Sequence, residues 1–329
     1  MGKPKVYCTH SLFEAPRQRL AEQFDAEYWT GDGRPPRAEV LKRVAGKAAL
    51  IPLLTERVDA ELLDAAGPSL RIVANVAVGF DNVDVPLCTS RGVAVTNTPG
   101  VLDETTADLA WALLMAVARR VVEGDRLARS GAWRQWNLDQ LCGTDVWGKT
   151  LGIIGLGRIG RAVARRAKGF QMRVIYYSTT RVPAEVENEL GAEYVPRDEV
   201  LARADFLSLH VPLTPETRGL IGAGELAKMK PTAFLINTTR GPVVQEAALA
   251  AALEQGKIAG AGLDVYEREP LISDGLRRDN VVLTPHIGSA SIETRTRMAM
   301  IAVENVIAYF EGKRPPTILN PEVLEQKTV

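Results

Sequence analysis

The sequence predicts an α/β protein that is built on parallel β-sheets and divided into about two domains. Short apolar runs rich in β-forming residues alternate with helical segments over residues 5–97, and a second alternating series begins at Lys149. Strands that alternate with helices in this way form parallel sheets, because each helix carries the chain back to the start of the next strand. The length of 329 residues exceeds what one ordinary core holds, so we expect two domains.

The first series ends where Pro99-Gly100 interrupts the alternation. Its strands are expected at 5–9, 48–53, 71–76 and 93–97, and its helices at 15–24 and 60–66.

A long helix at 104–130 is expected at a domain junction, with Asp103 as its N-terminal cap. Its segment 109–118 is apolar on every face, so it must be buried on every face. A central helix within one domain and a helix packed on a second subunit both satisfy this requirement.

The second series repeats the pattern and ends in an amphipathic helix. Its strands are expected at 151–155, 173–177, 206–211, 233–237, 260–264 and 281–284, and its helices at 158–170 and 292–310.

Composition excludes several classes of protein. With 46% hydrophobic and 24% charged residues the chain is globular, and 40 basic residues balance 40 acidic ones, so the basic excess of a nucleic-acid binder is absent. The three cysteines form no C-x-x-C pair, and no disulfide framework or metal site is expected. The first residues lack a signal-peptide core, and the longest strongly apolar run is half of what a bilayer needs. We expect a cytoplasmic protein without a membrane or nucleic-acid partner.

The strand at 151–155 runs into a glycine motif, Gly155-x-Gly157-x-x-Gly160, and a helix follows. Gly155 permits the tight turn, Gly157 lets the backbone approach a pyrophosphate, and Gly160 lets the helix pack closely on the strand. The start of the helix offers N–H groups and the positive end of its dipole to phosphates. In this strand–turn–helix context the motif predicts dinucleotide binding.

The loop after the strand at 173–177 is expected to select the cofactor. An Asp or Glu at its start would bind the ribose hydroxyls of NAD, but the sequence reads Ser178-Thr179-Thr180-Arg181. Hydroxyls and an arginine suit a 2′-phosphate, so we expect NADP(H) to be preferred over NAD(H). The alternative is a solvated loop that selects nothing, with NAD(H) bound in spite of it.

Only three histidines are present to carry a proton. His10 lies far in sequence from the glycine motif, and His210, at a strand end, is expected to be a packed, hydrogen-bonded residue. His286 also follows a strand, the stretch 266–270 supplies a carboxylate, and Arg240 stands at another strand end. Ligands bind outside the carboxyl ends of parallel strands, so an Arg, a Glu and a His on these loops make a chemically complete set. Scattered surface charges are the alternative.

Several motifs, in the correct order, resemble the D-isomer-specific 2-hydroxyacid dehydrogenase family over essentially the whole chain. Within the family the chain is most similar to glyoxylate/hydroxypyruvate reductases, whose NADP-using members carry a loop with Ser and Arg like 178–181. Besides the glycine motif, the matching stretches are 78–84, 97–100, 105–110, 237–241, 262–265 and 285–288.

The resemblance implies a role for each residue at the reacting centre. His286 is the general acid for carbonyl reduction. Glu269 orients His286 and favours its protonated form, because a nearby carboxylate stabilises an imidazolium. Arg240 holds the substrate carboxylate and polarises the carbonyl, and backbone N–H groups of Val78 and Gly79 complete the carboxylate site.

The resemblance also implies the dinucleotide contacts. The glycine motif and residues 178–181 hold the phosphates, and Asp264 meets the nicotinamide carboxamide. The other implied contacts are Thr106, Leu156, Arg158, Ile159, Val211, Pro212, Thr217, Thr238, Thr239, Arg240, His286 and Gly288.

The architecture implied by the resemblance is two Rossmann-like, doubly wound parallel-sheet domains with the active site in a cleft between them. The substrate-binding domain is discontinuous, 1–98 plus 290–329, and the dinucleotide-binding domain is 99–289. The expected activity is NADPH-dependent reduction of glyoxylate or hydroxypyruvate to the D-2-hydroxy acid by a homodimer. The alternatives are an NAD(H)-preferring dehydrogenase of larger 2-keto acids and, from a different class, a dinucleotide-sensing, corepressor-like binding protein.

Overall fold

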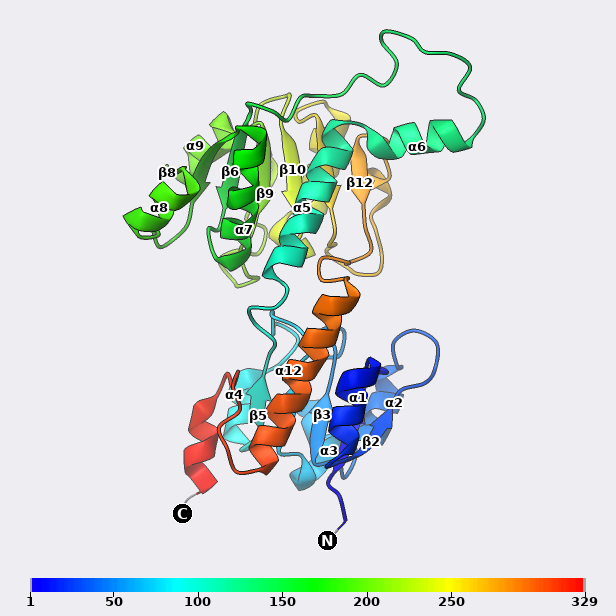
Figure 1. Cartoon of the computed structure of the whole chain (residues 1–329), viewed down its shortest axis with the longest axis vertical. Coiled ribbons are helices and arrows are strands. Elements are labelled where there is room, and N and C mark those ends of the chain that lie inside the picture. The colour runs from blue at the N-terminus through cyan, green and yellow to red at the C-terminus, as the bar shows by residue number, and fades with distance from the viewer. Residues whose placement is uncertain (1, 328–329) are drawn as a thin grey trace. The chain divides into compact units, whose positions relative to one another are not determined.

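The computed structural model describes residues 2–327, which form two compact units (Figure 1). Unit 1 contains the chain up to Leu102 and from Ala290 onward, and unit 2 is Asp103–Ser289. Each unit is built on one fully parallel sheet with helices on both faces. The predicted fold class, two doubly wound parallel-sheet domains, is confirmed.

Unit 1 has a five-stranded sheet in the order β2-β1-β3-β4-β5. Its strands β3, β4 and β5 are buried along their whole length, as expected of a parallel sheet covered on both faces. One face packs against α1 and α12, and the other against α2 and α3. The elements are β1 (Lys5–Cys8), α1 (Glu14–Ala21), β2 (Asp25–Tyr28), α2 (Arg37–Val44), β3 (Ala49–Ile51), α3 (Ala60–Ala66), η1 (Gly67–Ser69), β4 (Ile72–Ala74), α4 (Val85–Ser90), β5 (Ala94–Thr96), α12 (Ile292–Phe310) and η5 (Pro321–Lys327).

Unit 2 has a seven-stranded sheet in the order β12-β11-β10-β9-β6-β7-β8. Helices α5 and α7 pack on one face, and α9, α10 and α11 pack on the other. The elements are α5 (Asp103–Ala118), α6 (Val121–Arg129), β6 (Thr150–Ile154), α7 (Arg158–Ala167), η2 (Lys168–Phe170), β7 (Arg173–Tyr177), α8 (Ala184–Leu190), β8 (Ala192–Tyr194), α9 (Arg197–Arg203), β9 (Phe206–Leu209), α10 (Ala223–Leu226), β10 (Phe234–Asn237), η3 (Gly241–Val243), α11 (Glu246–Glu254), β11 (Gly260–Leu263), η4 (Asp274–Leu276) and β12 (Val281–Leu283).

The single helix predicted at 104–130 is wrong, because α5 and α6 are separate helices. Arg120, between them, has the left-handed backbone with φ of 53°. The last carbonyl of α5, at Ala118, accepts a hydrogen bond from the N–H of Thr144 at 2.8 Å, so the returning chain caps the helix at this point. A cap made by a residue 26 positions later leaves no sequence signal next to the helix end.

Helix α5 is a helix within unit 2 that is only partly covered. Leu113, Leu114 and Val117 are buried, and the indole N–H of Trp111 donates to the carbonyl of Val163 on α7 at 3.1 Å. Ala112 is exposed, so one face of this apolar helix is left uncovered by the described residues of its own chain.

The structure adds edge strands β2 and β8, which the sequence did not predict. Both carry a glutamate and are only partly buried, so they lack the continuous apolar run of the central strands. Residues 2–327 contain no helix with the length and hydropathy to cross a bilayer. The same residues contain no cluster of His, Cys, Asp or Glu that could hold a metal ion.

Candidate functional site

The glycine motif lies where the sheet of unit 2 reverses its winding. Strands β6, β7 and β8 run to one side and β9 to β12 to the other, so β6 and β9 are neighbours at the topological switch point. Gly155 directly follows β6, and His210 directly follows β9. In open α/β sheets ligands bind at the carboxyl ends of the strands at this point.

The backbone of the motif fits a bound pyrophosphate. Gly155 has φ of 97°, and a Cβ there would lie 2.5 Å from the carbonyl oxygen of His210. A Cβ at Gly160 would lie 2.2 Å from the carbonyl oxygen of Gly155, whereas nothing lies within 4 Å of one at Gly157. The helix hydrogen bonds of α7 begin with Arg161 donating to Gly157, so the N–H groups of the first turn precede the ladder and can donate to an anion.

The loop after β7 is attached to the glycine motif. The hydroxyl of Ser178 accepts a hydrogen bond from the N–H of Leu156 at 2.8 Å, and Thr179 and Thr180 are exposed. Arg181 forms a two-point ion pair with Glu187, which sequence reasoning missed, at 2.8 Å for both contacts. The loop therefore presents a hydroxyl, and a cation already paired with a carboxylate.

His286 and Glu269 are hydrogen-bonded to each other. Nδ1 of His286 lies 2.7 Å from Oε2 of Glu269, and the other carboxylate oxygen accepts the N–H of Tyr266 at 3.0 Å. Burial by itself would raise the pKa of Glu269, but the hydrogen bond and the charge of His286 outweigh it, so this pKa is lowered. Glu269 is thus held as a carboxylate beside the imidazole, whose Nε2 atom is left for a ligand.

Asp264 fixes the loop that carries His286. Its fully buried carboxylate accepts hydrogen bonds from the Thr284 hydroxyl at 2.6 Å and from the N–H groups of Ile287 and Gly288, both at 2.8 Å. His286 between them has φ of 54°, a left-handed backbone that needs such support. Burial raises the pKa of Asp264 in spite of these bonds. Its predicted contact with the nicotinamide remains a prediction.

Arg240 follows β10, at the same edge of the sheet. Asn237, the last residue of β10, donates from its amide to the Arg240 carbonyl at 3.1 Å and accepts from the N–H and hydroxyl of Thr239. Nη1 of Arg240 donates to the carbonyl of Thr239 at 2.9 Å. The hydroxyl of Thr238 is buried and has no hydrogen-bond partner among residues 2–327. This strand end therefore combines a cation with a hydroxyl that a ligand can satisfy.

The remaining predicted dinucleotide contacts of unit 2 line the same edge. Thr217 donates from its hydroxyl to the Pro212 carbonyl at 2.6 Å, and Val211 lies against Gly155. Thr106, on α5, lies beside Gly288. Arg158 is exposed and pairs with Asp103 at 3.2 Å, whereas Ile159 is half-buried.

Val78 and Gly79 belong to unit 1, in the loop after β4. The Val78 carbonyl accepts from the side-chain amide of Asn97 at 2.8 Å, and that of Gly79 accepts from Asn75 at 3.1 Å. No described residue accepts a hydrogen bond from the N–H of Val78 or Gly79. The two asparagines, which sequence reasoning missed, fix this loop with its N–H groups available to an anion.

Comparisons with known proteins identify the family of the chain. The family model described as "D-isomer specific 2-hydroxyacid dehydrogenase, NAD binding domain" matches residues 111–288. Glyoxylate reductases of Korarchaeum cryptofilum and Pyrococcus horikoshii are 53% and 52% identical to the chain, over 98% of both chains in each case.

The chain belongs to this family.

It is accordingly an NAD(P)-dependent oxidoreductase, and its glycine motif fits a nicotinamide dinucleotide. A solved Thermus thermophilus protein superposes with a TM-score of 0.90 at 47% identity, covering 96% of this chain and 99% of that one. A Sinorhizobium meliloti NADPH-dependent glyoxylate/hydroxypyruvate reductase, solved with NADP and malonate, gives 0.84 at 36% identity over 97% and 98%.

Proposed function

We propose that the protein reduces a small 2-keto acid, glyoxylate or hydroxypyruvate, to the D-2-hydroxy acid with NADPH. The observation that carries this proposal is the His286–Glu269 pair at the sheet edge that also presents Arg240 and the glycine motif. Whole-length relatives named glyoxylate reductase support the substrate class.

His286 is the general acid of the proposed reaction. The bound dinucleotide supplies the hydride. Glu269 occupies Nδ1, so the proton for the carbonyl oxygen comes from Nε2 of the imidazole. Asp264 keeps the imidazole in place by accepting hydrogen bonds from the Thr284 hydroxyl before it and from the N–H groups of Ile287 and Gly288 after it.

Arg240 and the loop of Val78 and Gly79 are proposed to hold the substrate. A guanidinium binds a carboxylate through two parallel N–H groups and polarises a neighbouring carbonyl. The N–H groups of Val78 and Gly79 supply further donors from unit 1. On this proposal unit 2 binds the dinucleotide and unit 1 contributes to the substrate site.

A panel of 2-keto acids assayed with NADPH and NADH tests the reaction. We expect the highest kcat/KM for glyoxylate or hydroxypyruvate with NADPH. Preference for a larger 2-keto acid would overturn the substrate assignment. Negligible turnover together with tight dinucleotide binding would favour a dinucleotide sensor.

Preference for NADPH is proposed from Ser178 and Arg181. An aspartate at position 178 would repel the 2′-phosphate, whereas the serine hydroxyl can donate to it and the arginine adds a charge-assisted hydrogen bond. The Sinorhizobium meliloti relative that was solved with NADP is NADPH-dependent. We expect kcat/KM for NADPH to exceed that for NADH by at least about tenfold, the lower end of what one such bond provides. The double variant Ser178→Asp/Arg181→Ala should reverse the order, and a variant that still favours NADPH would show that these residues do not select the cofactor.

A homodimer formed through α5, α6 and the segment up to Gly143 is also proposed. Helix α6 has no buried residue, and the segment after it leaves the body of unit 2 before returning to β6 (Figure 1). This segment carries Trp136 and Leu138 with 73% and 84% of their surfaces exposed, and an apolar patch of this kind marks an interface.

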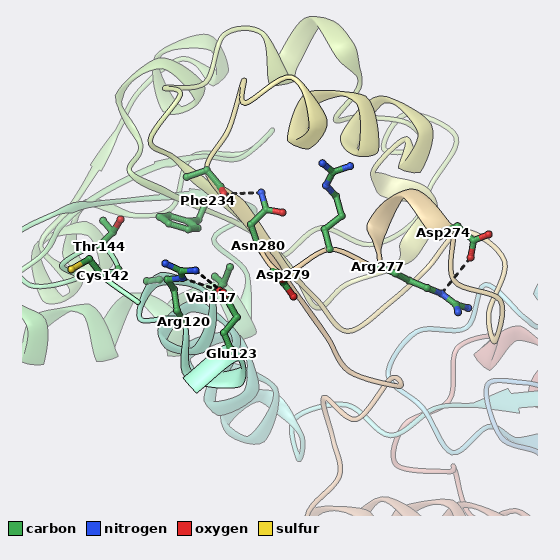
Figure 2. Close-up of a pocket in the computed structure, with 14 residues that line it drawn as sticks. Val117, Arg120, Glu123, Cys142, Thr144, Phe234, Asp274, Arg277, Asp279 and Asn280 are labelled. Carbon is green, nitrogen blue, oxygen red and sulfur yellow. Dashed lines mark hydrogen bonds and ion pairs between the residues drawn. The ribbon is translucent and has the colours of Figure 1, made fainter. Parts of the chain in front are cut away.

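A cavity of about 820 Å³ lies next to this segment, at the amino ends of β10, β11 and β12. Figure 2 shows Arg120 paired with Glu123, and Arg277 paired with Asp274, around it. The cavity lies at the sheet edge opposite to His286, so we assign it to subunit contact and not to chemistry.

Light scattering at micromolar protein should give about twice the chain's mass of 35.8 kDa. The double variant Trp136→Ser/Leu138→Ser should weaken the dimer, whereas Ile292→Ser, an exposed apolar residue of unit 1, should not. A monomeric wild-type protein would refute the dimer.

A further inference from the structure

The loop between β7 and α8 carries an ion pair with one buried and one exposed member. Nε and Nη2 of Arg181 each donate to a different oxygen of Glu187 at 2.8 Å. The Glu187 side chain is 10% exposed and that of Arg181 is 62% exposed. The carboxylate is therefore anchored in unit 2, and the guanidinium stands at its surface.

The carboxylate of Glu187 is held in place by a residue of the core of unit 2. Tyr176, which is fully buried in β7, donates from its hydroxyl to Oε1 of Glu187 at 2.6 Å and accepts the N–H of Val182 at 3.2 Å. The hydrogen bonds from Arg181 and from Tyr176 lower the pKa of Glu187 to about 2, so the group is a carboxylate at neutral pH. The Tyr194 ring faces the guanidinium of Arg181, whose Cζ atom lies 5.4 Å from the centroid of the ring.

This pairing decides which part of Arg181 meets a ligand. The edge formed by Nε and Nη2 is occupied by Glu187, and no described residue accepts a hydrogen bond from Nη1. The outward end of the guanidinium is therefore the part available to an anion. The same loop is tied to the glycine motif through Ser178 and Leu156, which keeps that end next to the dinucleotide turn.

We propose that Glu187 is a positioning residue that aims Arg181 at the 2′-phosphate of NADP. The inference rests on the NADPH preference proposed above and names the residue on which that preference depends. A long side chain loses rotamer entropy when an anion fixes it, and the pair with Glu187 has already removed most of that freedom.

The negative charge of Glu187 has an opposing effect, because it repels a phosphate. The guanidinium lies between the two anions, and at an exposed loop solvent and salt screen the repulsion. The orienting effect therefore dominates, and loss of the carboxylate should weaken NADPH binding although it removes a negative charge.

The experiment measures the dissociation constants of NADPH and NADH by nicotinamide fluorescence for a double-mutant cycle of Glu187→Gln and Arg181→Ala. We expect Glu187→Gln to weaken NADPH binding about 3- to 10-fold, as rotamer freedom returns to Arg181, with NADH changed less than about twofold. In the Arg181→Ala background the same substitution should have no further effect.

Two further variants separate positioning from charge and from misfolding. Tyr176→Phe keeps both charges and removes only the hydroxyl that anchors Glu187, so it should lower the NADPH preference in the same direction and by less. Glu185→Gln removes an equal charge from an exposed position on the same helix and should leave the preference unchanged.

The possible results separate the proposed NADPH preference from the role of Glu187. A wild-type protein that binds NADH as tightly as NADPH overturns both the proposed preference and this inference. Preference for NADPH that Arg181→Ala abolishes but Glu187→Gln leaves intact or raises overturns the role of Glu187 alone. If Glu187→Gln weakens NADPH binding in the Arg181→Ala background as well, Glu187 has a general structural role and does not act through Arg181.

Discussion

The sheets of the two units have related topologies, but their switch points are built differently. In unit 1 the winding reverses between β1 and β3, and in unit 2 between β6 and β9. At the switch point of unit 2 the chain places glycines and the first turn of α7. At that of unit 1 it places Glu56, which is buried, with 5% of its surface exposed.

Glu56 joins the carboxyl ends of β1 and β3 from within unit 1. One carboxylate oxygen accepts from the Thr9 hydroxyl at 2.6 Å and from the Leu53 N–H at 2.8 Å, and the other accepts from the Thr55 hydroxyl at 2.5 Å. A side chain thus satisfies the donors at the switch point of unit 1, whereas the first-turn N–H groups of α7 at that of unit 2 are proposed to bind the dinucleotide. The topology of each sheet produces a crevice at its switch point, and the residues that line this crevice decide whether a ligand can bind there.

The largest expected effect comes from the chemistry at the edge of unit 2. His286→Asn should lower kcat about 10²- to 10⁴-fold, because the general acid is lost, while the dinucleotide dissociation constant changes little. Stopped-flow measurement of hydride transfer and a fluorescence titration check both parts. A variant that keeps more than half of the wild-type rate under chemistry-limited conditions would remove His286 from the mechanism.

Arg240→Lys tests the substrate side of the same edge. Lysine keeps the charge but cannot offer two parallel N–H groups, so KM should rise and kcat should fall together. The expected loss in kcat/KM is about 10- to 150-fold, the worth of a charge-assisted hydrogen bond. Steady-state kinetics with glyoxylate measures it. An unchanged kcat with a raised KM would mean that Arg240 binds the carboxylate without polarising the carbonyl.

The sequence predicted those features of the two switch points that depend only on the order of neighbouring residues and elements along the chain. A glycine motif between a strand and a helix has one structural meaning, and a histidine just after a strand lies at the ligand-binding edge of a parallel sheet. The contacts of Glu187, Glu56 and Asp264 were not predicted. Asp264 holds a loop more than 20 residues away, and Glu56 contacts Thr9 on another strand end, so neither contact leaves a pattern in nearby sequence.

Glu56→Ala sharpens the contrast between the two switch points. The substitution removes the acceptor of the buried Thr9 hydroxyl and leaves the half-buried Leu53 N–H only its longer bond to that hydroxyl, at 3.2 Å, which should lower the free energy of unfolding by about 1–3 kcal/mol. Urea titration followed by circular dichroism measures this loss. Glu61→Ala, which removes an exposed glutamate paired with Arg37, should cost at most about 1 kcal/mol. Weaker dinucleotide binding without loss of stability would contradict a purely structural role for Glu56.

The last prediction concerns His210, which follows β9 at the switch point of unit 2. Its Nε2 atom lies 2.8 Å from the Ser208 hydroxyl, its buried Nδ1 atom has no partner among the described residues, and burial lowers its pKa to about 3. Between pH 6.5 and 3 the unfolded chain therefore binds a proton at this residue that the folded chain does not.

Stability attributable to His210 should consequently fall as the pH drops below 6.5, with a slope of at most about 1.4 kcal/mol per pH unit. The test compares urea unfolding of the wild-type protein and His210→Gln from pH 8 to pH 5. Glutamine can keep a hydrogen bond to Ser208 but binds no proton, so the two curves should run parallel above pH 7.5. Below pH 6.5 the wild-type protein should lose stability faster. Parallel curves over the whole range would mean that His210 is protonated in the folded protein, and that this switch point accommodates a cation beside the phosphate-binding turn.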